Sequence, residues 1–181
     1  MIIILILGGM LTQKLNMDDL NFEKGNFDGT TAYAQNKRQQ IIMTEQYANQ
    51  YPDIFWASMH PGWADTPAVR TSMPEFYEKM KDKLRTVEQG ADTIVWLACS
   101  KNALENNNGL FYQDRQPVST HLPFAQSRST AEECKQFMAK SALEKIRRGA
   151  VRGVNFVIYF FFFFNQNKKQ VGKIHQRERE P

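Results

Sequence analysis

Short apolar runs alternate along the chain with longer stretches in which apolar residues recur every three or four positions. The short runs predict three buried strands, near residues 2–7, 54–59 and 110–112. The longer stretches predict amphipathic helices at about residues 31–50, 87–100 and 129–148. Strands that alternate with helices are typical of a parallel sheet. The pattern therefore predicts an α/β fold, a partial parallel sheet of about three strands with helices that cover it.

Glycine, proline and asparagine mark the ends of these elements. Gly8-Gly9 closes the first strand, and polar residues 14–29 predict a long surface loop. The sequence His60-Pro61-Gly62 ends the second strand, and prolines at 67 and 74 leave only a helical segment at about 75–84 after it. Thr86 and Gln89 have the spacing of a capping box, which marks a helix start. The turn at 106–109 leads into the third strand, and Gly149 is a candidate helix C-cap.

Residues 150–181 have a different character, and we expect a separate tail that is disordered or loosely helical. Residues 154–164 are apolar and rich in Phe, and residues 165–181 contain five Lys/Arg. The apolar run is too short to cross a bilayer comfortably. One interpretation is a membrane-peripheral protein that contacts an anionic surface through residues 154–173. We favour the other, an appended terminus that adds no function and promotes aggregation.

The basic charge of the protein is concentrated at its carboxy-terminal end. Residues 147–181 hold eight Lys/Arg and two Glu, whereas the rest of the chain carries a net charge of −2. A body without a basic excess does not fit nucleic-acid binding, so we expect no nucleic-acid partner. The apolar run at residues 1–7 follows no positive charge and is too short to cross a bilayer, so we expect a cytoplasmic protein.

Cysteine and histidine residues give no metal-binding or disulfide pattern. Cys99 and Cys134 lie far apart without Cys-x-x-Cys spacing, so we expect two reduced, buried thiols. The three histidines are scattered, without Asp, Glu or Cys at ligand spacing. We therefore predict no metal site.

Tyr33 and Lys37 are the strongest candidates for chemistry. Their four-residue spacing places both side chains on one face of the predicted helix. A nearby ammonium favours the phenolate, so the tyrosine can exchange a proton with a carbonyl or alcohol oxygen. Tyr77 and Lys81 have the same spacing, but they lie in a run of charged residues where solvent would surround both heads. The sequence therefore favours Tyr33 as the acid/base and Lys37 as its activator.

The order of several motifs resembles the short-chain dehydrogenase/reductase family. Tyr33-x-x-x-Lys37 is followed, after the next strand, by the run 60–66, which reads His-Pro-Gly-Trp-Ala-Asp-Thr. Further similarities are Glu-Gln-Gly-Ala at 88–91 and Gly-Leu-Phe-Tyr-Gln-Asp at 109–114. The resemblance implies that residues 1–149 form the carboxy-terminal half of a Rossmann-like domain, so the sheet is a partial Rossmann-like one.

The resemblance also implies roles for individual residues. In that family the tyrosine protonates the substrate oxygen while a hydride moves to or from a nicotinamide, and the lysine also binds the nicotinamide ribose. Tyr33 and Lys37 match these positions. Pro61 and Gly62 match the turn that approaches the nicotinamide, and Thr66 matches the threonine that contacts the carboxamide or a phosphate. The implied cofactor is NADP or NAD, and the implied substrate is a small carbonyl or alcohol compound.

The sequence departs from the family pattern in two respects. The 181 residues contain no glycine-rich phosphate turn, which the family carries before these motifs. At the position of the usual catalytic serine the chain has Ile6-Leu7. We therefore expect an oxidoreductase-family chain that is truncated, inactive and unable to bind cofactor alone. The alternative to an enzyme is a non-catalytic product that associates through an exposed sheet edge at residues 2–7.

Overall fold

The computed structural model describes residues 1–6 and 8–147, and it divides the chain into two units, residues 1–140 and 141–181. The first unit contains the sheet, the four helices α1–α4 and the start of α5 (Ala131–Arg147). Of the second unit, only the end of α5 is described. The predictions for Gly149 and for the tail at 150–181 lie outside the described residues.

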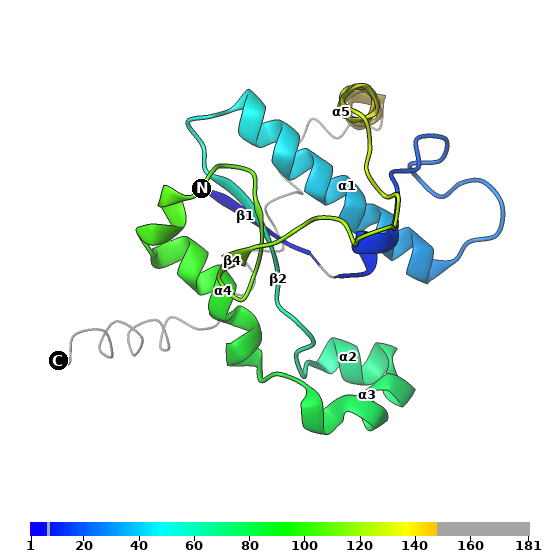
Figure 1. Ribbon diagram of the computed structural model, residues 1–181. Coiled ribbons are helices and arrows are strands. Elements are labelled where there is room, and N and C mark those ends of the chain that lie inside the picture. The colour runs from blue at the N-terminus through cyan, green and yellow to red at the C-terminus, as the bar shows by residue number, and fades with distance from the viewer. Residues whose placement is uncertain (7, 148–181) are drawn as a thin grey trace. The chain divides into compact units, whose positions relative to one another are not determined.

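The sheet has four strands in the order β1-β2-β3-β4 (Figure 1). The strands β1 (Ile2–Leu5), β2 (Trp56–His60) and β3 (Phe111–Gln113) are parallel neighbours, and β4 (Gln116–Pro117) pairs antiparallel with β3. The predicted α/β fold with a partial Rossmann-like parallel sheet is thereby confirmed. The sequence did not predict β4, because it is two residues long and contains a proline, which strands tolerate only at an edge.

The second strand begins later than predicted because Asn108 takes up the backbone groups in front of it. The side chain of Asn108 accepts from the N–H of Trp56 at 2.6 Å and donates to the carbonyl of Ile54 at 2.8 Å. Asn108 thus takes up the Ile54 carbonyl and the Trp56 N–H, whereas the carbonyl of Phe55 accepts from the N–H of Ile2 in β1 at 2.7 Å. The Asn-rich turn that the sequence indicated therefore also fixes where β2 starts.

Helices α1 (Gly29–Gln50) and α4 (Val87–Cys99) cover opposite faces of the sheet, as Figure 1 shows. Ile41 of α1 packs with Phe111 and Ile6, and Trp96 of α4 lies 6.0 Å from the ring of Tyr112. Phe111 and Tyr112 are neighbours on one strand, so their side chains point to opposite faces. The core of the first unit is therefore built on both sides of β3.

The carboxyl ends of β1 and β2 lead into short helical segments. After β1 the chain forms a 3-10 helix, η1 (Gly8–Thr12), in place of the simple turn that we predicted. After β2 it forms α2 (Pro67–Ser72), α3 (Pro74–Met80) and a 3-10 turn, η2 (Lys81–Lys83). Both short α-helices begin at a proline, which fits the first helical position but cannot continue a preceding helix. The prediction that the two prolines prevent one long helix is confirmed.

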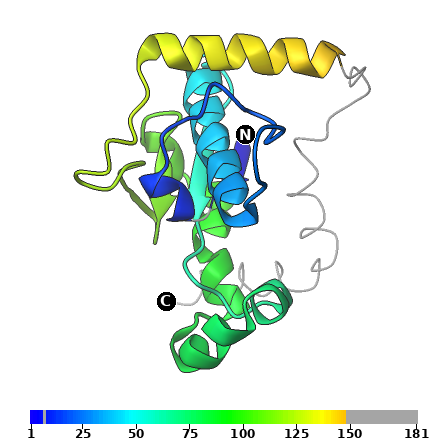
Figure 2. The same cartoon turned by 90° about the vertical axis from the view of Figure 1, so that its right-hand side faces the viewer.

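Helix α5 packs against α1 and the loop before it, and Figure 2 shows its first turns crossing α1. Cys134 and Phe137 of α5 are buried with Leu15, Ile42 and Met43. Thr130 begins the helix with a capping box, because its hydroxyl accepts from the N–H of Glu133 while the Glu133 carboxylate accepts from the N–H of Thr130. Between α4 and β3 the chain forms a 3-10 helix, η3 (Asn102–Glu105), in which Ala103 is buried.

Candidate active site

Tyr33 lies near the start of α1, toward the carboxyl ends of the strands. Because β1 and β2 are parallel, the connection between them must return along the sheet, so α1 begins at the carboxyl end of β1. The packing around Gly8-Gly9 agrees with this direction. A Cβ on Gly9 would lie 3.7 Å from the Cβ of Ala34, and one on Gly8 would lie 3.0 Å from Nε2 of His60. The start of α1 and the end of β2 therefore flank the same glycine pair.

Lys37 and Tyr33 lie on one face of α1 and contact each other. The Lys37 ammonium is 5.4 Å from the centre of the Tyr33 ring, and it also donates to Oε1 of Gln40 at 3.0 Å. Tyr33 is 45% exposed, so solvent reaches its side chain. Partial burial lowers the pKa of Lys37 below the usual value for lysine, because desolvation disfavours the charged form.

Tyr77 and Lys81, which share this spacing, are arranged differently. Lys81 donates to Oε2 of Glu78 at 2.9 Å and is exposed. The ring of Tyr77 lies 5.5 Å from the Arg70 guanidinium. Two tyrosines with the same sequence spacing therefore have different neighbours, a lysine for Tyr33 and an arginine for Tyr77.

The loop at 60–66 follows β2 and reaches the start of α2. Gly62 has φ +73°, in the left-handed region that favours glycine, and its N–H donates to Nδ1 of His60 at 3.0 Å. Thr66 is the N-cap of α2, and its hydroxyl oxygen accepts from the N–H of Val69 at 3.3 Å. The loop therefore brings Pro61, Gly62 and Thr66 together beyond the carboxyl end of β2.

Arg85 and Asp114 hold this loop, although the sequence indicated Asp114 only as part of the motif at 109–114 and did not single out Arg85. The Arg85 guanidinium binds both carboxylate oxygens of Asp114, at 2.5 and 2.9 Å. The backbone of Arg85 also forms two hydrogen bonds with the loop, both at 2.8 Å. Its N–H donates to the carbonyl of Trp63, and its carbonyl accepts from the N–H of Asp65. No local pattern indicates a pair that is 29 residues apart.

His60 is partly buried at the junction of these elements. Burial lowers the pKa of His60, the positive charge of Arg85 lowers it further, and Asp114 opposes both effects. Because Nδ1 accepts from Gly62, the neutral ring carries its proton on Nε2. The site thus combines a phenol, an ammonium and a neutral imidazole.

Some expectations concern other parts of the molecule. Cys134 is buried as predicted, but Cys99 is exposed because it is the last residue of α4, so its predicted burial was wrong. Among the described residues, no group of three or more His, Cys, Asp or Glu side chains is arranged to hold a metal ion. Within residues 1–6 and 8–147, no helix has the length and apolar character that crossing a bilayer requires.

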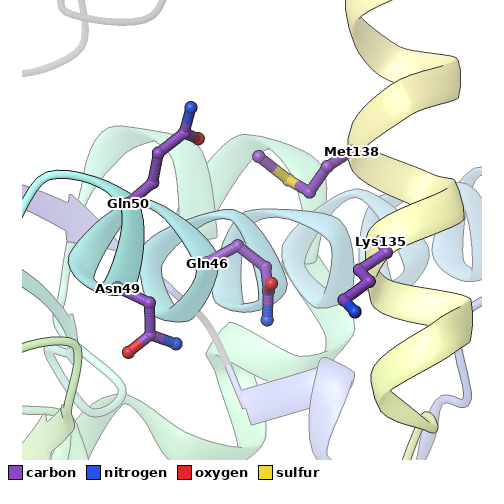
Figure 3. Close-up of a pocket in the computed structure, with 5 residues that line it drawn as sticks. All are labelled: Gln46, Asn49, Gln50, Lys135 and Met138. Atoms are coloured by element: carbon purple, nitrogen blue, oxygen red, sulfur yellow. The ribbon is translucent and has the colours of Figure 1, made fainter.

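A hollow lies between α1 and α5, away from Tyr33. It has a volume of about 340 Å³ and is lined by Gln46, Asn49, Gln50, Lys135 and Met138 (Figure 3). Its lining consists of amides, one ammonium and one thioether. None of these residues belongs to the family motifs, so the candidate active site remains at the start of α1.

The comparisons with known proteins agree with the sequence motifs. The chain is 56% identical over 126 residues to the Homo sapiens protein named dehydrogenase/reductase SDR family member 12, and 53% identical over 126 residues to the Bos taurus protein of that name. A protein of Streptomyces sp. (strain C5), named as a daunorubicin C-13 ketoreductase, is 34% identical over 108 residues, which is 59% of this chain and 37% of that protein. No model of a known protein family matches the chain.

The matched region covers 70% of this chain but only 40% of the length of either mammalian relative. The names of the relatives are those of oxidoreductases, and the family uses NAD or NADP with small-molecule substrates. The resemblance found from the motifs is confirmed, and the two mammalian relatives carry the name of member 12 of that family. Over the residues that it shares with these relatives, the chain belongs to the short-chain dehydrogenase/reductase family.

Proposed function

We propose that this chain forms the proton-transfer side of an NAD(P)-dependent site that interconverts a carbonyl and an alcohol. In this proposal residues 1–149 are the carboxy-terminal half of the catalytic domain. The observation that carries the proposal is the contact between the Lys37 ammonium and the Tyr33 ring at the start of α1. Ligand crevices in parallel sheets form at the carboxyl ends of the strands, which is where α1 begins.

Tyr33 is the acid and base in the proposed reaction. During reduction, the Tyr33 hydroxyl gives its proton to the carbonyl oxygen of the substrate, and the hydride that the carbonyl carbon gains would come from a bound nicotinamide. The product is an alcohol, and the phenolate left on Tyr33 regains a proton from solvent, which reaches the exposed side chain. The Lys37 ammonium stabilises that phenolate, and its partial burial strengthens the attraction because less water screens the charge.

The residues of the site suit a nicotinamide nucleotide. Lys37 offers ammonium protons to ribose hydroxyls, and the Thr66 hydroxyl still has its own proton to donate after it accepts from Val69. Pro61 and Gly62 offer carbonyl oxygens in a turn without a side chain at position 62, since the Gly62 N–H already donates to His60. A bound cofactor would supply or accept the hydride. Its pyrophosphate normally rests on a glycine-rich turn, which the 181 residues do not contain.

A fusion protein tests the role of Tyr33. A segment with the family's glycine-rich turn is placed before Met1, a serine replaces Leu7, and NADPH oxidation is followed with small ketones. We expect Tyr33→Phe to lower kcat by about 10²–10⁴-fold, the usual contribution of a general acid, while NADPH affinity stays nearly unchanged. Lys37→Met should weaken both kcat and cofactor binding.

Tyr77→Phe is the matched control, because Tyr77 has the same spacing to a lysine but a different neighbour. The control should retain the activity of the parent fusion. Equal losses in Tyr33→Phe and Tyr77→Phe, or none in Tyr33→Phe, would remove Tyr33 from the reaction.

The chain by itself should lack cofactor binding. We expect no saturable change in fluorescence when residues 1–181 are titrated with NADPH, because the proton-transfer pair cannot hold a pyrophosphate. Saturable binding at micromolar NADPH would contradict this expectation and show that the chain alone is a complete binding unit.

A further inference from the structure

Gly62 lies directly against the side chain of Arg85. A Cβ at position 62 would lie 2.6 Å from Nε and 2.7 Å from Cζ of Arg85, so any other residue would push the guanidinium out of this position. The same residue has φ +73°, which other residues rarely adopt. Arg85 Nη1 also lies 3.4 Å from the carbonyl oxygen of Pro61. The guanidinium therefore covers one side of the Pro61–Gly62 turn.

Asp114 fixes the direction of that guanidinium. It is the first residue of the two-residue turn between β3 and β4, where Asp114 and Arg115 both have positive φ. Arg115 anchors this turn to α4, because its guanidinium pairs with Asp92 and its N–H donates to the Thr93 hydroxyl at 3.2 Å. Asp114 is thus held at the carboxyl end of β3, where it binds Arg85 through two oxygens.

The backbone of Arg85 is fixed as firmly as its side chain. Arg85 forms a parallel bridge with Ala64 through its two backbone hydrogen bonds. The next residue, Thr86, begins α4 with a capping box. Arg85 therefore links the Pro61–Gly62 turn at the end of β2 to the start of α4 and to the β3–β4 hairpin.

We propose that Arg85, oriented by Asp114, is a positioning residue that holds the Pro61–Gly62 turn in its left-handed conformation before any cofactor or substrate binds. This inference rests on the proposed function, in which the Pro61–Gly62 turn contacts the cofactor. The ion pair itself is partly exposed, with side-chain accessibilities of 33% for Arg85 and 56% for Asp114, so its strength comes from its two-point geometry. A preformed turn loses little conformational entropy when it meets a ligand.

The test uses residues 1–181 without cofactor and measures amide hydrogen exchange of Gly62 by NMR. Arg85→Met and Asp114→Asn should each raise the exchange rate of this amide roughly two- to fivefold, the range for one exposed ion pair. Arg85→Lys should restore little of the protection, because an ammonium cannot bind both oxygens of Asp114 while covering Gly62. Arg70→Met is the matched control, since it breaks the pair with Asp65 at the other end of the same loop.

The pKa of His60, measured by NMR on the same samples, separates charge from general loosening. Arg85 and Asp114 are the charged groups that act on His60, and they act in opposite directions. The pKa of His60 should rise in Arg85→Met and fall in Asp114→Asn, whereas simple loss of packing would move both the same way. Unchanged Gly62 exchange in both variants, or an equal rise in Arg70→Met, would overturn the proposal. Neither readout involves NADPH or Tyr33, so failure here is distinct from failure of the proposed reaction.

Discussion

Lys37 and Arg38 are adjacent in the sequence but have very different surroundings. Lys37 lies beside Tyr33, whereas Arg38 is 1% exposed and its guanidinium donates to three carbonyl oxygens, those of Met10, Gln13 and Thr120. Buried charge is tolerated only when hydrogen bonds satisfy it. Burial lowers the pKa of Arg38 and the charge of Glu45 opposes that effect. Arg38 thus ties the segments after β1 and β4 to the helix that carries Tyr33.

Because His60 is partly buried near Arg85, its titration should make the free energy of unfolding depend on pH. Burial and the Arg85 charge hold the pKa of His60 in the folded protein below the ordinary value of 6.5. As pH falls below about 6.5, the unfolded chain takes up a proton that the folded protein still refuses. The free energy of unfolding should therefore decrease with falling pH until the folded-state pKa is passed. Protonation of Nδ1 also removes the acceptor of the Gly62 N–H, which lowers the free energy of unfolding further.

Urea unfolding at pH values from 7.5 to 5.0 measures this effect. The His60→Gln variant should show a smaller loss of stability over the window than the parent. His121 contributes in the same direction, because burial and the charges of Arg38 and Arg128 lower its pKa, so His121→Gln serves as the second variant. A parent and a His60→Gln variant with identical pH profiles would be inconsistent with a partly buried His60 whose pKa is lowered.

At the scale of elements, α4 organises the candidate site although it contributes no catalytic group. Its start holds Arg85 against the loop after β2. Its first turns hold the β3–β4 turn through Asp92 and Thr93. A helix that starts at a defined residue can place two loops at once, because backbone positions at its first turn are fixed by the cap. The capping box at Thr86 was predicted from the sequence and is confirmed: the hydroxyl accepts from the N–H of Gln89, and the Gln89 side chain accepts from the N–H of Thr86.

Removal of the cap should therefore weaken both the fold and the loop. We expect Thr86→Ala to lower the free energy of unfolding by about 1 kcal/mol. The same variant should speed amide exchange at Gly62, because Arg85 precedes the cap directly. Chemical unfolding and NMR exchange measure the two effects.

Thr71→Ala is the control for this prediction. The Thr71 hydroxyl is exposed and bonds only within α2, to the carbonyl of Pro67 at 2.9 Å. Its loss should cost less than about 0.5 kcal/mol. If Thr86→Ala lowers the free energy of unfolding no more than Thr71→Ala does, the cap does not stabilise the fold.

At the scale of the whole molecule, the two edges of the sheet differ. Within the described residues β1 is one edge strand, and its residues, Ile2–Leu5, include neither a charge nor a proline. The other edge, β4, is short, exposed and contains Pro117. Natural sheets protect their edges with charges, prolines or short strands, so β1 is the edge that invites pairing with another strand. We propose self-association through β1, as the sequence pattern predicted.

Sedimentation velocity at several protein concentrations tests this proposal. We expect Ile2→Lys to shift the protein toward the monomer, because an ammonium at the edge opposes strand pairing. Leu104→Lys, at an exposed position in η3, is the matched control and should associate like the parent. A chain that ends at Arg147 isolates the contribution of the Phe-rich run. Association in this shortened chain that Ile2→Lys does not reduce would argue against β1 as the interface.

The sequence alone determined the order and type of the three parallel strands and of the main helices. Apolar runs, helical periodicity and turn residues are local signals, so they located three strands, the main helices and the cap at Thr86 within a few residues. The order of the Tyr33–Lys37 pair and the loop at 60–66 also identified the family, which the relatives confirm over 126 residues. Local propensity misplaced the start of β2, because the side chain of Asn108 competes there with the sheet for backbone groups.

Only the tertiary structure decided which side chains meet. It gave the two tyrosines of equal spacing different neighbours, a lysine for Tyr33 and an arginine for Tyr77, because these contacts come from packing and not from the helix repeat. It also brought together Arg85 and Asp114, and it buried Arg38 against carbonyl groups up to 82 residues away in the sequence. Such contacts depend on how strands and helices pack across the sheet, and spacing along the chain carries no information about that.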